Sequence, residues 1–184
     1  MLSGKNVLLA ITGSIAAYKS AYLIREFIKK GAQVKVIVTE SALQFVTKVT
    51  LSTLSKNPVY KDFIKNEETG QWNNHVDLGS WADLMVIAPA TANTISDLVS
   101  GKGNSFLLTT FLSCNAPVFV APAMDLDMFK NKSTQSNIKI LSERSVEIIE
   151  PTEGELASGL EGKGRMQEHD RIVTIISEYF LNKA

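Results

Sequence analysis

"NVLLAITGSIAAYKSAYLIREFIKKGAQVKVIVT" (Asn6–Thr39) is the stretch that decides the fold. Residues 6–12 form a short apolar run that predicts a buried β-strand, and a Gly-Ser pair ends it. Residues 14–30 carry apolar side chains at helical spacing, and residues 33–39 form a second apolar strand. The residues that carry this helical spacing are Ile15, Tyr18, Tyr22 and Ile28. A strand, a helix and a strand within about 35 residues predict a βαβ unit with parallel strands and a right-handed crossover.

The same alternation continues to the end of the chain. Further strands are expected at 84–90, 116–123 and 146–151, and helices at 91–101, 104–114, 133–144 and 170–182. Strands that are apolar throughout and separated by helices predict a sheet covered on both faces. We therefore expect a single α/β domain over residues 1–184, with a doubly wound parallel sheet of Rossmann-like or flavodoxin-like type.

Composition narrows the class of protein. The 184 residues include 19 Lys+Arg and 19 Asp+Glu, so the formal net charge is zero. A neutral chain gives no electrostatic reason to expect a nucleic-acid or membrane partner. The single cysteine, Cys114, excludes an internal disulfide framework and a cysteine-based zinc site, and it suits the reducing cytoplasm. The first residues show no export signal.

Polar residues follow four of the predicted strands, where ligands bind in open α/β sheets. Gly13 and Ser14 open a helix, so free backbone N–H groups there suit an anion. The second and third glycines of a dinucleotide motif are missing, which favours one phosphate over a pyrophosphate. Thr39 and Ser41 follow the next strand, although each of these hydroxyls could equally be a plain helix cap.

The next two strand ends are richer in polar groups. Residues 91–94 (TANT) offer more hydroxyl and amide groups than capping requires, which favours a rim for a planar heterocycle. Asp125 and Asp127 follow the strand after that, but with no nearby histidine they do not predict a metal site. His75 lies in the segment 72–83, in a polar loop that we expect to lead into a strand. A hydrolase triad of His75, Asp77 and Ser158 lacks the expected G-x-S-x-G motif.

Four segments together resemble one family. They are "GSIAAYK" (13–19), "NHVDLGSWADLMVIAPATANT" (74–94), "PAMDLDMF" (122–129) and "GELASGLEGKGRM" (154–166). They resemble the flavin-dependent cysteine decarboxylases, in particular the phosphopantothenoylcysteine decarboxylases of coenzyme A biosynthesis, over nearly the whole chain. This resemblance implies FMN as cofactor. The cofactor-binding residues it implies are Gly13, Ser14, Ile15, Thr39, Ser41, Thr91, Ala92, Asn93, Thr94, Ala123 and Met124.

The resemblance also implies a reaction and an assembly. The cysteine thiol of the substrate is oxidised to a thioaldehyde, carbon dioxide leaves, and the resulting enethiol is reduced to 4′-phosphopantetheine. His75, Asp125 and Ser158 would be catalytic, and a flexible clamp at about 152–167 would close over the substrate. The substrate-binding residues implied are Asp125, Ala157, Ser158, Lys163, Arg165 and Met166. The family implies a homotrimer with flavin between subunits, often a dodecamer, and in some members a fused phosphopantothenate–cysteine ligase domain.

Two residues depart from the family pattern. Asp125 stands where the family usually has asparagine, and Ser158 where its clamp usually has cysteine. Since serine is a far weaker acid than a thiol, the last protonation needs another route, or the reaction stops at the enethiol. Two alternatives therefore stay open: an oxidative decarboxylase of a C-terminal peptidyl cysteine, and a non-catalytic FMN-binding regulator. An intact His75 argues against the regulator.

Overall fold

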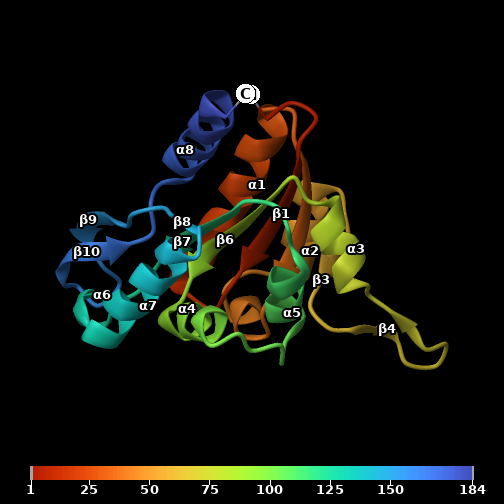
Figure 1. Cartoon of the computed structure of the whole chain (residues 1–184), viewed down its shortest axis with the longest axis horizontal. Helices are drawn as coiled ribbons and strands as arrows, with labels where there is room; N and C mark the ends of the chain where they lie inside the picture. Colours follow the sequence, from red (N-terminus) through yellow and green to blue (C-terminus); the bar gives the residue numbers. More distant parts are fainter. Residues whose placement is uncertain (1, 184) are drawn as a thin grey trace.

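The computed structural model describes residues 2–183 and is built on one six-stranded sheet (Figure 1). Its strands are β1 (Asn6–Ile11), β2 (Gln33–Val38), β3 (Val59–Tyr60), β6 (Leu84–Ala90), β7 (Val118–Pro122) and β8 (Glu147–Ile148). All neighbouring pairs are parallel, in the order β3-β2-β1-β6-β7-β8. Numbered along the chain, these six strands have the order 3-2-1-4-5-6 of the Rossmann fold. The predicted doubly wound α/β class is confirmed.

Helices cover both faces of the sheet (Figure 1). One face packs against α1 (Ser20–Lys29), α2 (Lys48–Ser55) and α8 (His169–Asn182). The other packs against α3 (His75–Trp81), α4 (Ala92–Val99), α5 (Phe106–Ser113) and α7 (Lys132–Glu143). All seven residues of β6 are buried, as expected for a central strand between two helical layers.

Short helices follow several strands. They are the 3-10 helices η1 (Ile15–Lys19) and η2 (Ser41–Gln44), and the α-helix α6 (Leu126–Lys130). The predicted helix at 14–30 is therefore η1 followed by α1. The periodic residues Ile15, Tyr18, Tyr22 and Ile28 lie on its exposed side. The core side is formed instead by Ala17, Leu23, Ile24 and Phe27, so a large apolar residue can recur at helical spacing without facing the core.

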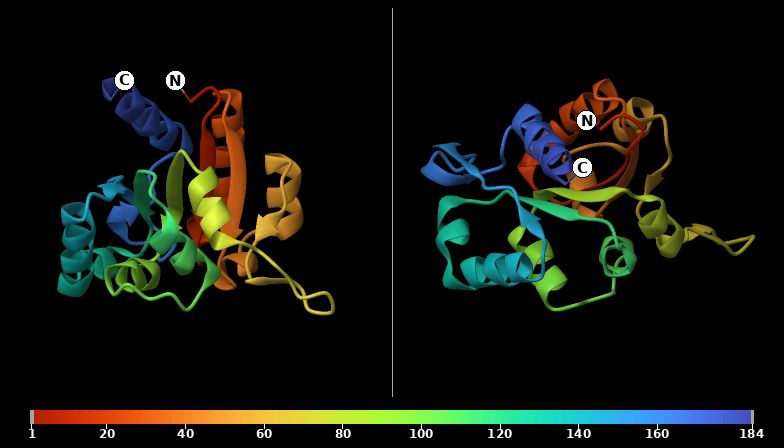
Figure 2. Two further views of the ribbon diagram at one scale, coloured as in Figure 1. Left: turned by 45° about the vertical axis from the view of Figure 1, so that its right-hand side comes forward. Right: turned by 45° about the horizontal axis from the view of Figure 1, so that its top comes forward.

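Two antiparallel hairpins lie at opposite ends of the molecule (Figure 2). The first, which we call the arm, pairs β4 (Ile64–Asn66) with β5 (Gln71–Trp72). The second pairs β9 (Thr152–Glu155) with β10 (Glu161–Arg165) and contains most of the predicted clamp, so we keep that name for it. The sequence predicted only a polar loop and a flexible lid for these two segments. Within residues 2–183, every helix is too short or too polar to cross a membrane.

Candidate functional site

The strand order reverses between β1 and β6, and a threonine joins the ends of these two strands. The buried Thr12 donates a hydrogen bond from Oγ1 to the Pro89 carbonyl (2.8 Å) and accepts one from the Thr91 backbone N–H (3.1 Å). The chain departs from β1 into η1 and from β6 into α4, which opens a crevice at this switch point. Sequence reasoning missed Thr12, although a hydroxyl at the end of a buried strand could have pointed to it.

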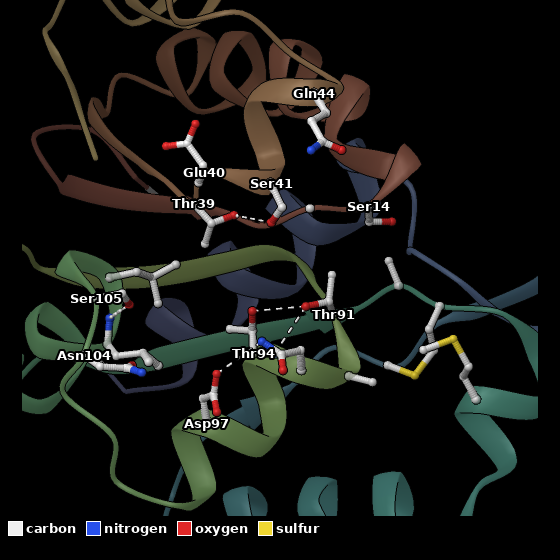
Figure 3. A pocket seen from close by; sticks show the side chains of 18 residues that line it. Ser14, Thr39, Glu40, Ser41, Gln44, Thr91, Thr94, Asp97, Asn104 and Ser105 are labelled. Carbon is white, nitrogen blue, oxygen red and sulfur yellow. Dashed lines mark hydrogen bonds between the residues drawn. The ribbon is translucent and has the colours of Figure 1, made fainter. Parts of the chain in front are cut away.

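A cavity of about 720 Å³, the switch-point cavity, fills this crevice (Figure 3). It brings together all the predicted cofactor-binding residues except Ile15: Gly13, Ser14, Thr39, Ser41, Thr91, Ala92, Asn93, Thr94, Ala123 and Met124. Met128, Asn104 and Ser105 also line it, and the sequence did not single out the last two. The volume lies in the range of about 300–1,000 Å³ that is usual for cofactor sites.

One end of this cavity suits a phosphate. A Cβ on Gly13 would lie 2.3 Å from the Ser41 hydroxyl oxygen, so only glycine lets β1 turn so close to η2. Ser14 caps η1 by accepting a hydrogen bond from the Ala16 backbone N–H (3.2 Å), and the Thr39 and Ser41 hydroxyls are 3.1 Å apart. These hydroxyls and helix-start N–H groups form a small polar cradle that fits a single phosphate.

The other wall begins at Thr91, whose role is partly structural. Its Oγ1 accepts a hydrogen bond from the Thr94 backbone N–H (3.2 Å), so it is the N-cap of α4. Asn93 is exposed on the cavity wall, and its amide donates to Asp97 (3.2 Å). One residue of this segment therefore serves as a cap, and the Asn93 side chain, bonded to Asp97, lies on the cavity wall.

A second cavity of about 500 Å³ adjoins the first, and both are lined by Ser14, Ala123 and Met124. We call it the clamp cavity because residues of the clamp form one wall. It brings together the predicted substrate residues Asp125, Ala157, Arg165 and Met166. Ile15, placed with the cofactor by the sequence, lines this cavity instead, next to Tyr18 and Lys19.

Two predicted substrate residues lie outside both cavities. Ser158 is exposed at the tip of the clamp, where its Oγ accepts a weak hydrogen bond from the Leu160 backbone N–H (3.4 Å). Lys163 forms an ion pair with Glu150 (2.6 Å), and its ammonium lies 5.7 Å from the Phe129 ring centre. The hairpin would have to move to bring Ser158 over a bound ligand.

Among the predicted site residues, His75 differs most in its position from the sequence prediction. It does not lie in a loop before a strand: it is the first residue of α3, because the Asn74 side chain accepts hydrogen bonds from the Val76 (3.0 Å) and Asp77 (3.3 Å) N–H groups and starts a helix. His75 lines neither the switch-point cavity nor the clamp cavity. Its ring meets the edges of Phe63 and Trp72, with centroids 6.0 and 6.2 Å apart. Its Nδ1 is buried without a hydrogen-bond partner among the described residues.

Across residues 2–183, His, Cys, Asp and Glu side chains form no group of three that could hold a metal ion. Cys114, at the end of α5, is partly buried against the core, and burial raises the pKa of its thiol. A raised pKa disfavours the reactive thiolate.

A Rossmann-type sheet with a phosphate cradle and a polar wall at its switch point defines a mononucleotide-binding protein. The chain belongs to the Flavoprotein family, whose model matches residues 1–181.

Individual relatives agree with this assignment. The chain is 43% identical over 180 residues to the coenzyme A biosynthesis bifunctional protein CoaBC of Bacillus subtilis (strain 168), covering 98% of this chain and 44% of that protein. It is 54% identical over 138 residues to a cysteine/cysteine sulfinic acid decarboxylase from an unknown prokaryotic organism, covering 75% of this chain and 38% of that protein. The chain thus spans less than half the length of these two relatives.

Among solved structures, a PPC decarboxylase mutant complexed with pantothenoylaminoethenethiol superposes with a TM-score of 0.85 at 33% identity. The match covers 96% of this chain and 98% of that one.

Proposed function

We propose that this protein is an FMN-dependent decarboxylase that converts 4′-phospho-N-pantothenoyl-L-cysteine to 4′-phosphopantetheine in coenzyme A biosynthesis, in the cytoplasm. The observation that carries this proposal is the meeting of two cavities at Ser14, Ala123 and Met124. One has a phosphate cradle for a flavin mononucleotide, and the other lies under the clamp. Bound FMN supplies a two-electron oxidation of the thiol-bearing carbon of the substrate and later returns the two electrons.

The protein's own residues bind the cofactor and the substrate and orient them. Gly13, Ser14, Thr39 and Ser41 would hold the FMN phosphate, and the segment 91–94, which lines the same cavity, would contact its ring. In the clamp cavity, Arg165 provides positive charge for the carboxylate of the substrate. Asp125 lines the same cavity, and its carboxylate would repel the carboxylate of the substrate.

The position of His75 supports an assembly of several copies. It lies outside the cavities of its own chain, beside an arm whose large apolar side chains Ile64 (52%) and Trp72 (54%) are exposed, as is Val76 (47%). Exposed apolar residues beside an unpartnered buried nitrogen suit a contact with another subunit. We infer a homotrimer, itself able to build a dodecamer, in which His75 serves a neighbour's cavity and assists deprotonation of the substrate thiol.

The length of the relatives supports a further part of the proposal. CoaBC is more than twice as long as the matched region, and it is named as bifunctional. We propose that this chain corresponds to the decarboxylase part, with a phosphopantothenate–cysteine ligase domain as the second part in fused relatives.

The test is a visible absorption spectrum followed by a product assay. Purified protein should be yellow, and 4′-phosphopantothenoylcysteine should yield 4′-phosphopantetheine, seen by mass spectrometry as loss of carbon dioxide alone. Loss of carbon dioxide together with two hydrogens would indicate that the reaction stops at the enethiol, as expected if Ser158 cannot replace the usual cysteine. A colourless protein that takes up no added FMN would refute the proposal.

Asp125 favours a second candidate function, decarboxylation of free cysteine. Its carboxylate lines the clamp cavity, and among the described residues no side chain forms an ion pair with it. Free cysteine carries an ammonium group that Asp125 would bind, whereas the phosphopantothenoyl substrate has a neutral amide there. The relative with 54% identity is named for this substrate. Asp125→Asn should lower turnover of free cysteine and raise that of the phosphopantothenoyl substrate if this candidate is correct.

A further inference from the structure

A buried lysine holds the C-terminal end of the clamp. Lys19, the last residue of η1, is only 5% exposed, which is rare for a lysine unless its ammonium is paired. Its Nζ donates hydrogen bonds to the Met166 carbonyl oxygen (3.2 Å) and to Glu168 Oε1 (2.9 Å). Both acceptors lie in the segment that joins β10 to α8, 147 and 149 residues further along the chain. One ammonium thus ties the first βα connection to the end of the clamp.

The carboxylate of Glu168 extends this tie to the clamp itself. The same oxygen, Oε1, lies 3.1 Å from an Arg165 guanidinium nitrogen, so the two cations share one acceptor. Lys19 and Arg165 both line the clamp cavity. Met166, whose carbonyl oxygen accepts from Lys19, lies between Arg165 and Glu168 in the sequence. The Arg165 side chain also lies over β9, because a Cβ on Gly154 would be 3.5 Å from its guanidinium. Arg165 is therefore paired with Glu168 and lies beside β9 at the cavity wall.

We propose that Lys19 is a positioning residue for the clamp: it fixes the Met166 backbone directly and orients Arg165 through Glu168. For the fold, the inference stands on these contacts alone. Its consequence for the substrate, that Arg165 is held ready for an anionic group, rests on the proposed function. Both hydrogen bonds of Lys19 lie at the C-terminal end of the clamp, away from its tip at residues 156–160.

Limited proteolysis tests the anchor without any activity assay. Trypsin can cut the clamp after Lys163 and Arg165, and it can cut the arm after Lys65 as an internal reference. Lys19→Met keeps the length of the side chain and removes the charge and the donors. We expect it to speed cleavage in the clamp about tenfold or more relative to cleavage in the arm, because charge-assisted hydrogen bonds are lost. Lys29→Met is the matched control, since Lys29 pairs only with Glu26 on the surface of α1.

Two further variants keep the test decisive if Lys19→Met does not fold. Glu168→Gln leaves the bond from Lys19 to Met166 and removes the charge that holds Arg165, so clamp cleavage should rise about threefold. Lys19→Arg keeps a buried cation with several donors and should restore most of the protection. Equal clamp cleavage in wild type, Lys19→Met and Glu168→Gln would overturn the proposal, as would equal loss of protection in Lys19→Met and Lys19→Arg.

A kinetic measurement separates positioning from general stabilisation. With the phosphopantothenoyl substrate, Lys19→Met and Glu168→Gln should raise KM about tenfold with a smaller change in kcat, and FMN content should stay at the wild-type level. Loss of FMN together with activity would point to a general structural defect and contradict a specific role in the clamp. If wild type itself has no decarboxylase activity, the proposed function fails, and the proteolysis result still decides the role of Lys19.

Discussion

The clamp and the arm are both short hairpins, but the chain holds the clamp at several points and the arm only at its base. The clamp is docked along its length: the Met124 N–H donates to the Gly164 carbonyl (3.0 Å), Lys163 pairs with Glu150, and Lys19 holds its end. At the base of the arm, Asn73 donates hydrogen bonds to the backbone carbonyl groups of Asp62 and Phe63. The ring of Phe63 packs on Phe106. Its outer residues extend from the body of the molecule (Figure 2).

This difference indicates where each hairpin acts. The clamp faces a cavity of its own chain and needs a fixed base with a free tip. The arm has exposed apolar residues next to His75, and in the proposed trimer a neighbouring subunit supplies the contacts that its own chain lacks. The following predictions test this contrast.

The largest effect is expected from His75→Asn. Removing a general base should lower decarboxylation by about 10²–10⁴-fold while the protein stays yellow, because His75 lies outside the cavity proposed to bind FMN. In trimers assembled at random from equal amounts of His75→Asn chains and FMN-free Gly13→Val chains, about a quarter of the sites should regain activity. These are the sites where the cavity of a His75→Asn chain meets the intact His75 of a Gly13→Val neighbour. Mixtures that stay inactive would mean that His75 does not serve a neighbouring subunit.

The docking of the clamp is tested by Gly164→Ala. A Cβ at this position would lie 2.5 Å from the Met124 carbonyl oxygen, so β10 must move away from the strand end that carries Asp125. Overpacking of this kind costs about 1–3 kcal/mol. A free-energy cost of this size corresponds to a tenfold or larger loss in kcat/KM, which we expect for this variant. Gly103→Ala is the control, since its Cβ would make an ordinary 3.6 Å contact with Thr109. Equal kinetics for the two variants would show that the close approach is unimportant.

The contrast between the hairpins also shows what sequence reasoning can reach. The sheet was predictable, because β1, β2, β6 and β7 are largely apolar runs separated by segments that read as helices or loops. The family resemblance is confirmed by the Flavoprotein match. The residues of the two cavities stay predictions as to their roles, although most of them line the cavities where the motifs suggested.

The sequence did not predict the elements that have no apolar periodicity. Helix α2 (KVTLSTLS) is rich in β-branched residues and serines, which are weak helix formers, and its start depends on the Thr47 cap. The two hairpins lack alternating apolar residues, so their strands gave no signal. Lys19 was not recognised because its partner Glu168 is 149 residues away, and only the folded chain brings the two together.

A smaller effect is expected from Trp72→Ala in the arm. If a neighbour covers this side chain, its removal should weaken assembly about tenfold or more, because buried tryptophans are frequent interface hot spots. We would measure the mass in solution by light scattering over a dilution series. On dilution, the mass of Trp72→Ala should begin to fall at a higher protein concentration than the mass of wild type. Leu181→Ala in α8 removes a side chain of comparable exposure (61% against 54%) and should leave the mass unchanged. Trp72→Ala with an unchanged mass would place the arm outside the interface.

The smallest effect concerns the pH dependence of the clamp anchor. The hydrogen bond from Lys19 lowers the pKa of Glu168 below the usual value of a glutamic acid, and the charges of Lys19, Arg165 and His169 add to this against the opposing effect of burial. A lowered folded-state pKa gives stability that is present above the unfolded value of about 4.3 and is lost as the pH falls through the folded value.

Wild type should therefore exceed Glu168→Gln in thermal midpoint near about pH 6, and the gap should close toward about pH 3. Because the Glu168 side chain is 42% exposed and screened by solvent, the gap should be no more than about 1 kcal/mol, or roughly 2–4 °C. A gap that is constant over this pH range would show that the carboxylate charge does not stabilise the anchor. The anchor would then depend on the bond from Lys19 to the Met166 backbone, which Glu168→Gln retains.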